Sequence, residues 1–133
     1  MLTAQSVPLF HARGRVLSEP VVSLVNVPPA DNSAMDGYAM RLEDLNLNII
    51  PVSQRIAAGQ VPHTLKAQTC ARVFTGAEVP DNTELVVIQE DIEIVDGGVR
   101  IRSSALEQGQ KWGQFIRPSG QDVVEGQLVC EAG

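Results

Sequence analysis

A mainly β fold is predicted for this chain of 133 residues, and three observations predict it. The apolar residues come in short runs of strand length instead of at helical spacing. No stretch of about a dozen residues combines helical periodicity with capping residues at its ends. The segment from Ile92 to Arg102 alternates apolar and charged side chains around Asp96-Gly97, as a hairpin does. We therefore expect an irregular, elongated arrangement of short, twisted or coiled β-sheets with hairpins and few short helices.

The N-terminal part, residues 1 to 27, alternates short apolar segments with chain breakers. Val7 to Phe10 is followed by Gly14, and Val21-Val22 follows Pro20. This pattern predicts short extended segments. The stretch begins without a preceding element that could cap it, so we expect it to belong to a longer chain.

The most unusual stretch runs from Asp31 to Ala39 and reads Asp-Asn-Ser-Ala-Met-Asp-Gly-Tyr-Ala. It follows Pro28-Pro29, which fix the backbone and favour extended geometry before each proline. Asp, Asn and Ser favour turns because their side chains hydrogen-bond to nearby backbone groups. We therefore predict a turn that exposes its backbone. Asp31 and Asp36 share a face of neither a helix nor a strand, so their carboxylates converge only if the loop folds back.

The chemistry of this stretch leaves more than one interpretation open. A capped turn with carboxylates facing water is the simplest. An EF-hand calcium loop is excluded, because its pattern needs an oxygen ligand where Met35 stands and a glutamate at the end of the loop. A flexible pair of carboxylates could help to hold Mg²⁺, as many surface loops could.

The middle of the chain predicts short strands separated by turns. In chain order we expect one or two helical turns in Met40–Leu47, a surface loop around Arg55–Ala58, a strand at Cys70–Thr75, a turn at Pro80–Asn82 and a strand at Leu85–Ile88. The last of these is a continuous apolar run, which is typical of a strand buried on both faces.

The hairpin is the best-defined local structure. If Asp96-Gly97 is a two-residue type I′ turn, the facing pairs are Ile94 with Val99, Glu93 with Arg100 and Ile92 with Ile101. The apolar pairs then share one side of the hairpin and the charged pair lies on the other. Beyond it, we expect at most one helical turn in Ser103–Gln110 and two strands, Val123-Val124 and Leu128–Cys130, around a turn.

Composition excludes several classes of function. The net charge is −6 and the basic residues form no run, which disfavours binding to nucleic acid. No apolar run approaches the roughly 20 residues that span a bilayer, and the N-terminus lacks the order of a signal peptide, so no membrane partner and a cytoplasmic location are expected. Cys70 and Cys130 form no C-x-x-C motif and predict reduced thiols.

The familiar nucleophile, phosphate-loop, dinucleotide and paired-histidine motifs are absent from the sequence. Thr75-Gly76 and Ser119-Gly120 are hydroxyl-glycine turns, which can present backbone N–H groups to an oxyanion. Such turns are common, so composition and spacing alone indicate a β-rich domain without a defined role.

The stretch from Pro28 to Ala39 strongly resembles the N-terminal region of the MoeA and gephyrin E-domain family, the molybdopterin molybdotransferases. Other blocks resemble the family in the same order: Ala57-Ala58-Gly59 with Pro62, Phe74–Ala77 with Pro80, Val86–Asp91, and Ile116-Arg117 with Gly120, Asp122 and Gly126. The resemblance covers nearly the whole chain.

The resemblance implies an enzyme that inserts molybdate into adenylylated molybdopterin in a Mg²⁺-dependent step, with release of AMP, during molybdenum cofactor biosynthesis. It implies a homodimer and, as a further partner, the molybdopterin adenylyltransferase. Residues 1–27 and 103–133 would form an elongated β subdomain, part of family domain I, and residues 28–102 a compact β-rich lobe, family domain II. The family's α/β pterin-binding domain and β-barrel domain lie C-terminal to this region, so the chain alone is expected to be inactive.

The resemblance also implies roles for particular residues at a cleft shared with the partner's α/β domain. Asp36 would act on Mg²⁺ or molybdate, directly or through water, and Thr75 would offer hydroxyl and backbone donors to an oxyanion. Asp122 would be a second acid at the cleft. The implied substrate- or oxyanion-binding residues are Ser33, Gly37, Gly76 and Arg117.

The turn at Pro80 lacks the family's usual Gly-Ala-Asp run and has Thr83-Glu84-Leu85 there, and two positions in the last block also depart from the family pattern. Phe115 and Gln121 stand where the family usually has the asparagine of Asn-Ile-Arg and the glutamate of Gly-Glu-Asp. These departures motivate the hypothesis of a diverged paralogue that inserts tungstate or has lost activity. A second alternative is a scaffold or interaction module of the gephyrin type, which would carry a long linker and an additional domain upstream.

Overall fold

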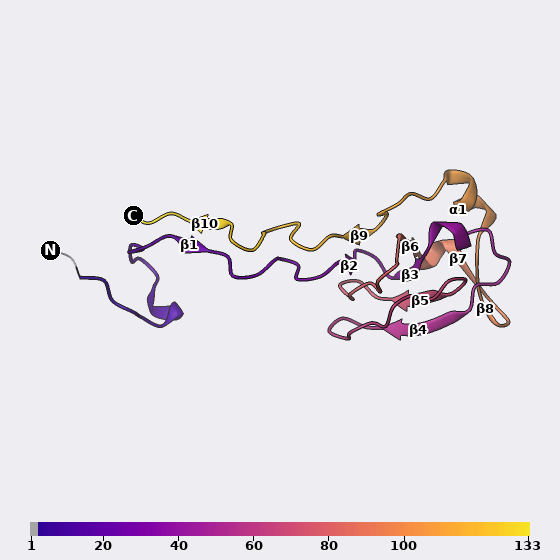
Figure 1. The fold of residues 1–133 in the computed structure, drawn as a ribbon, viewed down its shortest axis with the longest axis horizontal. Helices are drawn as coiled ribbons and strands as arrows, with labels where there is room; N and C mark the ends of the chain where they lie inside the picture. Colours follow the sequence, from indigo (N-terminus) through magenta and orange to yellow (C-terminus); the bar gives the residue numbers. More distant parts are fainter. Residues whose placement is uncertain (1–2) are drawn as a thin grey trace.

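The structure, a computed structural model, describes residues 3–133. Figure 1 shows two distant segments of the chain, residues 21–33 and 116–130, side by side. Together they form a long two-stranded ribbon that leads into a compact lobe. Strand β1 (Val21–Val22) pairs antiparallel with β10 (Leu128–Cys130), and β2 (Asn32–Ser33) pairs antiparallel with β9 (Ile116–Arg117). An isolated bridge between Val27 and Val123 lies between these two pairs.

The lobe is built on a four-stranded sheet in the order β4-β5-β3-β6. The strands are β3 (Gly37–Met40), β4 (Val52–Ile56), β5 (Cys70–Val73) and β6 (Leu85–Ile88). Strands β4 and β5 are parallel, and the other pairs are antiparallel. The hairpin of β7 (Ile92–Val95) and β8 (Gly98–Ile101) follows, and the helical elements are η1 (Leu9–His11), η2 (Leu42–Asp44), η3 (Gln89–Asp91) and α1 (Ser103–Gln108). The predicted mainly β fold with few short helices is confirmed.

The core of the lobe lies on both faces of the sheet, because successive side chains of a strand point to opposite faces. One face carries Met40, Cys70 and Leu85, and the hairpin and α1 cover it. The other face carries the smaller residues Ala39 and Ala71, which pack with side chains from the loops. Ala105 of α1 is fully buried in the first cluster, although the predicted division places residues 103–133 in the elongated part.

The predicted register of the hairpin is confirmed, with Ile92 opposite Ile101, Glu93 opposite Arg100 and Ile94 opposite Val99. The predicted type I′ turn is wrong: Gly97 has φ +84°, but Asp96 is not among the residues with positive φ, which a type I′ turn requires at both positions. Ile94 is 80% exposed, because the tip of the hairpin extends beyond the core.

Several other predicted elements differ in the structure. Gly37 to Ala39 form part of the buried central strand instead of an exposed turn, because an apolar run of strand length follows Asp36 directly. Strand β4 includes Arg55 and Ile56, which the sequence assigns to a loop because polar residues interrupt its apolar pattern.

The two ends of the chain contain two further differences. Val7 to Phe10, predicted as extended, leads into the 3-10 turn η1. Val123-Val124 forms only a bridge, whereas Leu128–Cys130 is a strand as predicted and pairs with β1. Within residues 3–133 no helix is long and apolar enough to cross a membrane.

The two cysteines are expected to react very differently. Both are free thiols, and burial raises the pKa of the Cys70 thiol to about 12, while Cys130 is exposed. Since the thiolate is the reactive form, iodoacetamide at pH 8 should alkylate Cys130 in the folded protein and reach Cys70 only after denaturation. Intact-mass measurement should therefore show one adduct before denaturation and two after it. The Cys130→Ser variant should show none while folded, and rapid labelling of Cys70 in that variant would contradict the burial.

Candidate active site

The centre of the site is a contact between Asp36 and Thr75. Asp36 immediately precedes β3, and Thr75 follows β5. Because Gly37 faces Val73 across these antiparallel strands, the start of one strand lies beside the end of the other. The Oδ1 atom of Asp36 accepts hydrogen bonds from the backbone N–H of Thr75 at 2.8 Å and from its hydroxyl at 2.9 Å.

These contacts fix the ionisation state of Asp36. The backbone N–H of Thr75 is the main reason why the pKa of Asp36 lies below its ordinary value, and the Thr75 hydroxyl and the charge of Arg72 act in the same direction. Partial burial opposes them but does not outweigh them. Asp36 is therefore a carboxylate at neutral pH. Its second oxygen, Oδ2, accepts no hydrogen bond from residues 3–133 and is free to meet a ligand.

Removing the Thr75 hydroxyl should raise the pKa of Asp36. The Thr75→Val variant keeps the shape of the side chain and the backbone N–H, so the carboxylate loses one of its two donors. The pKa of Asp36 in the folded protein lies below its ordinary value of 3.8. The ionised carboxylate therefore stabilises the fold fully above pH 3.8, and this stabilisation disappears as the pH falls through the folded-state pKa. In Thr75→Val the stabilisation should disappear at a higher pH than in the wild type.

Titration of the side-chain carboxyl carbons by NMR measures this shift. The pKa of Glu93 is also below its ordinary value, because Arg100 donates a hydrogen bond to it, and it should not change in Thr75→Val. An unchanged Asp36 titration would show that the hydroxyl contributes nothing.

Ser33 shapes the loop that carries Asp36. Its hydroxyl donates to the carbonyl of Met35 at 2.5 Å and accepts from the N–H of Met35 at 3.3 Å. Only 1% of Ser33 is exposed. The structure therefore uses this predicted binding residue to close the turn between β2 and β3.

The two glycines predicted to bind ligand have structural tasks as well. Gly76 is exposed with φ +81°, and its N–H donates to the carbonyl of Ser33 at 2.8 Å. Gly37 is buried, and a Cβ atom there would lie 3.0 Å from both Val86 Cγ1 and the carbonyl carbon of Val87. The donors of Thr75 are likewise directed at Asp36 instead of at an open position.

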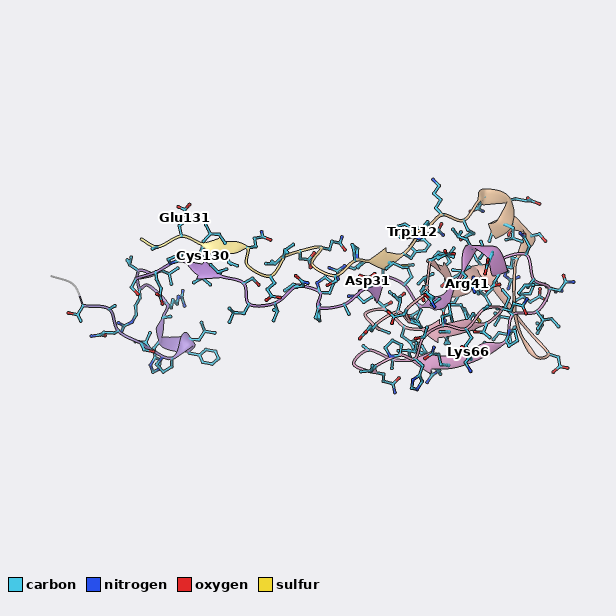
Figure 2. All side chains as sticks on the ribbon, viewed as in Figure 1. Asp31, Arg41, Lys66, Trp112, Cys130 and Glu131 are labelled. Carbon is cyan, nitrogen blue, oxygen red and sulfur yellow. The ribbon has the colours of Figure 1, made fainter. Side chains whose placement is uncertain are left out.

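Arg117 and Asp122 form a separate contact where the ribbon meets the lobe. Their side chains form an ion pair at 2.8 Å, and both are about half exposed. Within residues 3–133 neither makes a hydrogen bond or ion pair with Asp36. Figure 2 shows Asp31 at the same junction, where it accepts a hydrogen bond from the N–H of Ser119 at 2.7 Å. Asp31 and Asp36 therefore contact different parts of the chain.

The residues of the chain fit Mg²⁺ only in part. Among residues 3–133 no group of three His, Cys, Asp or Glu side chains is placed to hold a metal ion. Mg²⁺ usually binds through one or two carboxylates together with substrate phosphates and water. Asp36, with one free oxygen, suits the role of a single protein ligand, and the other ligands would have to come from outside this chain.

Four residues next to Asp36 are not among the site residues predicted from the sequence: Arg72, Tyr38, Phe74 and Gln89. Arg72 stacks on Tyr38 and Phe74 and donates a hydrogen bond to Gln89. The alternation of Cys70–Thr75 places Arg72 and Phe74 on one face of the strand, so the sequence indicates these two residues but gives no signal for Tyr38 or Gln89.

Comparison with known proteins identifies the family. A family model described as the MoeA N-terminal region, domains I and II, matches residues 1–133. The chain belongs to this MoeA family. Molybdopterin molybdenumtransferase 2 of Mycobacterium tuberculosis is 42% identical over 135 residues, which cover 96% of this chain and 32% of that protein. The molybdopterin molybdenumtransferase of Haemophilus influenzae is 37% identical over 127 residues, covering 94% and 30% of the two chains.

A solved structure shares the fold of this MoeA N-terminal region. The crystal structure of a molybdopterin biosynthesis MoeA protein from Pyrococcus horikoshii superposes with a TM-score of 0.81 at 30% identity, covering 94% of this chain and 32% of that one. The chain thus spans about a third of the length of its MoeA relatives.

Proposed function

We propose that this chain is the N-terminal part of a molybdopterin molybdotransferase, which inserts molybdate into adenylylated molybdopterin with Mg²⁺ and releases AMP. The observation that carries the proposal is the carboxylate of Asp36, held ionised by Thr75 with one oxygen free, in a chain of the MoeA family. The names of the relatives, molybdopterin molybdenumtransferases, support the transfer of molybdenum to molybdopterin, and the resemblance to the family implies the Mg²⁺, the adenylylated substrate and the AMP.

In this proposal Asp36 is the residue that meets the ligand. Its free oxygen would bind Mg²⁺, whose positive charge would offset the negative charges of molybdate and of the adenylylated pterin. Thr75 orients this oxygen by holding the other one. Ser33, Gly37 and Gly76 shape the backbone around the two residues, as their buried or internally bonded groups indicate.

Arg117 and Asp122 would form a second part of the cleft wall. The guanidinium of Arg117 uses one nitrogen to bond Asp122, which leaves other N–H groups for an anion. Asp122 would then orient the arginine, and its own charge would be offset by the pair. This assignment keeps both residues at the cleft but gives the anion contact to Arg117.

The proposal includes a homodimer in the cytoplasm. Residues 28–102 would form the lobe that faces the active cleft, and residues 1–27 with 103–133 the elongated subdomain. This chain supplies the free carboxylate oxygen of Asp36 and the ion pair of Arg117 with Asp122. The remaining groups that hold Mg²⁺ and the substrates would come from the pterin-binding domain of the partner subunit. The molybdopterin adenylyltransferase would supply the substrate.

Turnover by the full-length protein tests the proposal. Purified protein with adenylylated molybdopterin, molybdate and Mg²⁺ should release AMP and form the molybdenum cofactor, and omission of either ion should stop the reaction. The H. influenzae relative serves as the positive control for the substrate. No AMP release under conditions where the control works would refute the proposal, and replacing molybdate by tungstate tests the diverged-paralogue alternative. Stable capture of another protein without turnover would favour the scaffold alternative.

A further inference from the structure

Arg72 lies on β5, beside the strand that carries Asp36, and its guanidinium is held on several sides. One nitrogen, Nη1, donates to the carbonyl of Gly37 at 3.3 Å, and Nη2 donates to Oε1 of Gln89 at 2.7 Å. The guanidinium carbon lies 5.1 Å from the ring centre of Tyr38 and 4.6 Å from that of Phe74. Two hydrogen bonds and two aromatic rings thus fix its position.

Gln89 links this guanidinium to Asp36 from the other side. It follows β6, whose Ile88 faces Gly37, so it lies next to the start of β3. Its backbone N–H donates to the carbonyl of Asp36 at 3.0 Å. Two consecutive carbonyls, those of Asp36 and Gly37, therefore accept hydrogen bonds from the Gln89 backbone and from Arg72, and Arg72 also donates to the side chain of Gln89.

No ion pair competes for Arg72. The ion pairs within residues 3–133 involve Arg41, Arg100 and Arg117, and none involves Arg72. A guanidinium that forms a fork of hydrogen bonds to backbone and amide oxygens fixes geometry better than a flexible ammonium would. One of its hydrogen bonds goes to the segment that carries Asp36, and the other goes to Gln89, whose backbone N–H is bonded to Asp36.

We propose that Arg72 is a positioning residue for Asp36, whose guanidinium holds the Asp36–Gly37 backbone so that the free carboxylate oxygen has a fixed direction. The kinetic consequence rests on the proposed function, in which Asp36 meets the ligand. The structural consequence, a fixed backbone at Asp36, does not depend on it.

Arg55 provides a matched control on the neighbouring strand. It faces Arg72 in the parallel pair of β4 and β5, and its guanidinium carbon lies at the same 4.6 Å from the Phe74 ring centre. Unlike Arg72, it donates no hydrogen bond to the Asp36–Gly37 backbone or to Gln89 within residues 3–133. Arg55→Gln therefore removes the same charge and the same type of stacking without touching the backbone that carries Asp36.

The test compares Arg72→Gln, Arg72→Lys and Arg55→Gln in the full-length protein. Arg72→Gln should lower kcat about tenfold and change KM for adenylylated molybdopterin by less than about threefold, because a misplaced reacting group affects the chemical step more than binding. Arg72→Lys should fall between this variant and the wild type, since an ammonium cannot reproduce the fork. Arg55→Gln should stay within about twofold of the wild type.

Hydrogen exchange gives a readout that is independent of turnover. The amide of Gln89, which donates to Asp36, should exchange about tenfold faster in Arg72→Gln and at the wild-type rate in Arg55→Gln. Equal effects of Arg72→Gln and Arg55→Gln on both readouts would overturn the proposal.

The outcomes also separate this proposal from the proposed function. Faster exchange at Gln89 together with full activity of an Asp36 variant would support the positioning role and refute the function of Asp36. If Arg72→Gln does not fold, Arg72→Lys decides the matter, because wild-type kcat and wild-type exchange in that variant would overturn the proposal.

Discussion

Under the proposed function, replacing Asp36 by alanine in the full-length protein is expected to lower the rate of molybdate insertion by about 100-fold or more, the typical cost of removing a preorganised charged or polar group from an active site. The variant loses the free carboxylate oxygen and leaves both donors of Thr75 without their acceptor. Asp36 is only half-buried, so the fold should survive the change. The measurement is AMP release with adenylylated molybdopterin, molybdate and Mg²⁺.

Asp36→Asn separates the charge from the shape. Asparagine keeps an oxygen that can accept from Thr75, but it has no negative charge to attract a cation. A loss close to that of Asp36→Ala would assign the effect to the charge. Asp96→Asn, at the exposed tip of the hairpin, should retain wild-type turnover as a matched control. Asp36→Asn with turnover within about threefold of the wild type would remove Asp36 from the chemistry.

The parts of the fold that the sequence predicts correctly are those with local pairing. The hairpin register follows from alternating side chains on both sides of a two-residue turn, so Ile92 and Ile101 could be paired without knowledge of the rest. The strand Leu85–Ile88 is visible because it is apolar on both faces. The parallel pairing of β4 with β5 depends on a sheet assembled from distant segments, and the largely polar sequence of β4 does not indicate this pairing.

The site shows the same division. The resemblance to the MoeA family singles out Asp36 and Thr75, but their contact depends on the pairing of β3 with β5, which the sequence alone does not specify. The sequence also does not specify the direction of the two Thr75 donors, because the rotation of one peptide group and of the Thr75 side chain decides whether they face Asp36 or a ligand. The position of Arg72 can be predicted in part, because strand alternation places it on the same face of the strand as Phe74.

Gly37→Ala is expected to destabilise the fold by about 3 kcal/mol or more, because overpacking a buried strand forces the backbone to move. The added Cβ would overlap the carbonyl oxygen of Val87 and lie 3.0 Å from the carbonyl carbon of the same residue. These are backbone atoms of the paired strand β6, so a side-chain rotation cannot relieve the contact. The glycine of Asp-Gly-Tyr-Ala is therefore required because β6 approaches so closely, whereas Gly37 lies outside the positive-φ region.

Urea denaturation of the 133-residue chain measures this effect against Gly76→Ala. Gly76 has φ +81° and open space around its Cβ position, so alanine there should cost only the strain of a left-handed residue, about 1–2 kcal/mol. The two variants make the same chemical change on either side of the Asp36–Thr75 contact. A smaller loss for Gly37→Ala than for Gly76→Ala would mean that β3 and β6 can separate without cost, and that the rigid support inferred for Asp36 does not exist.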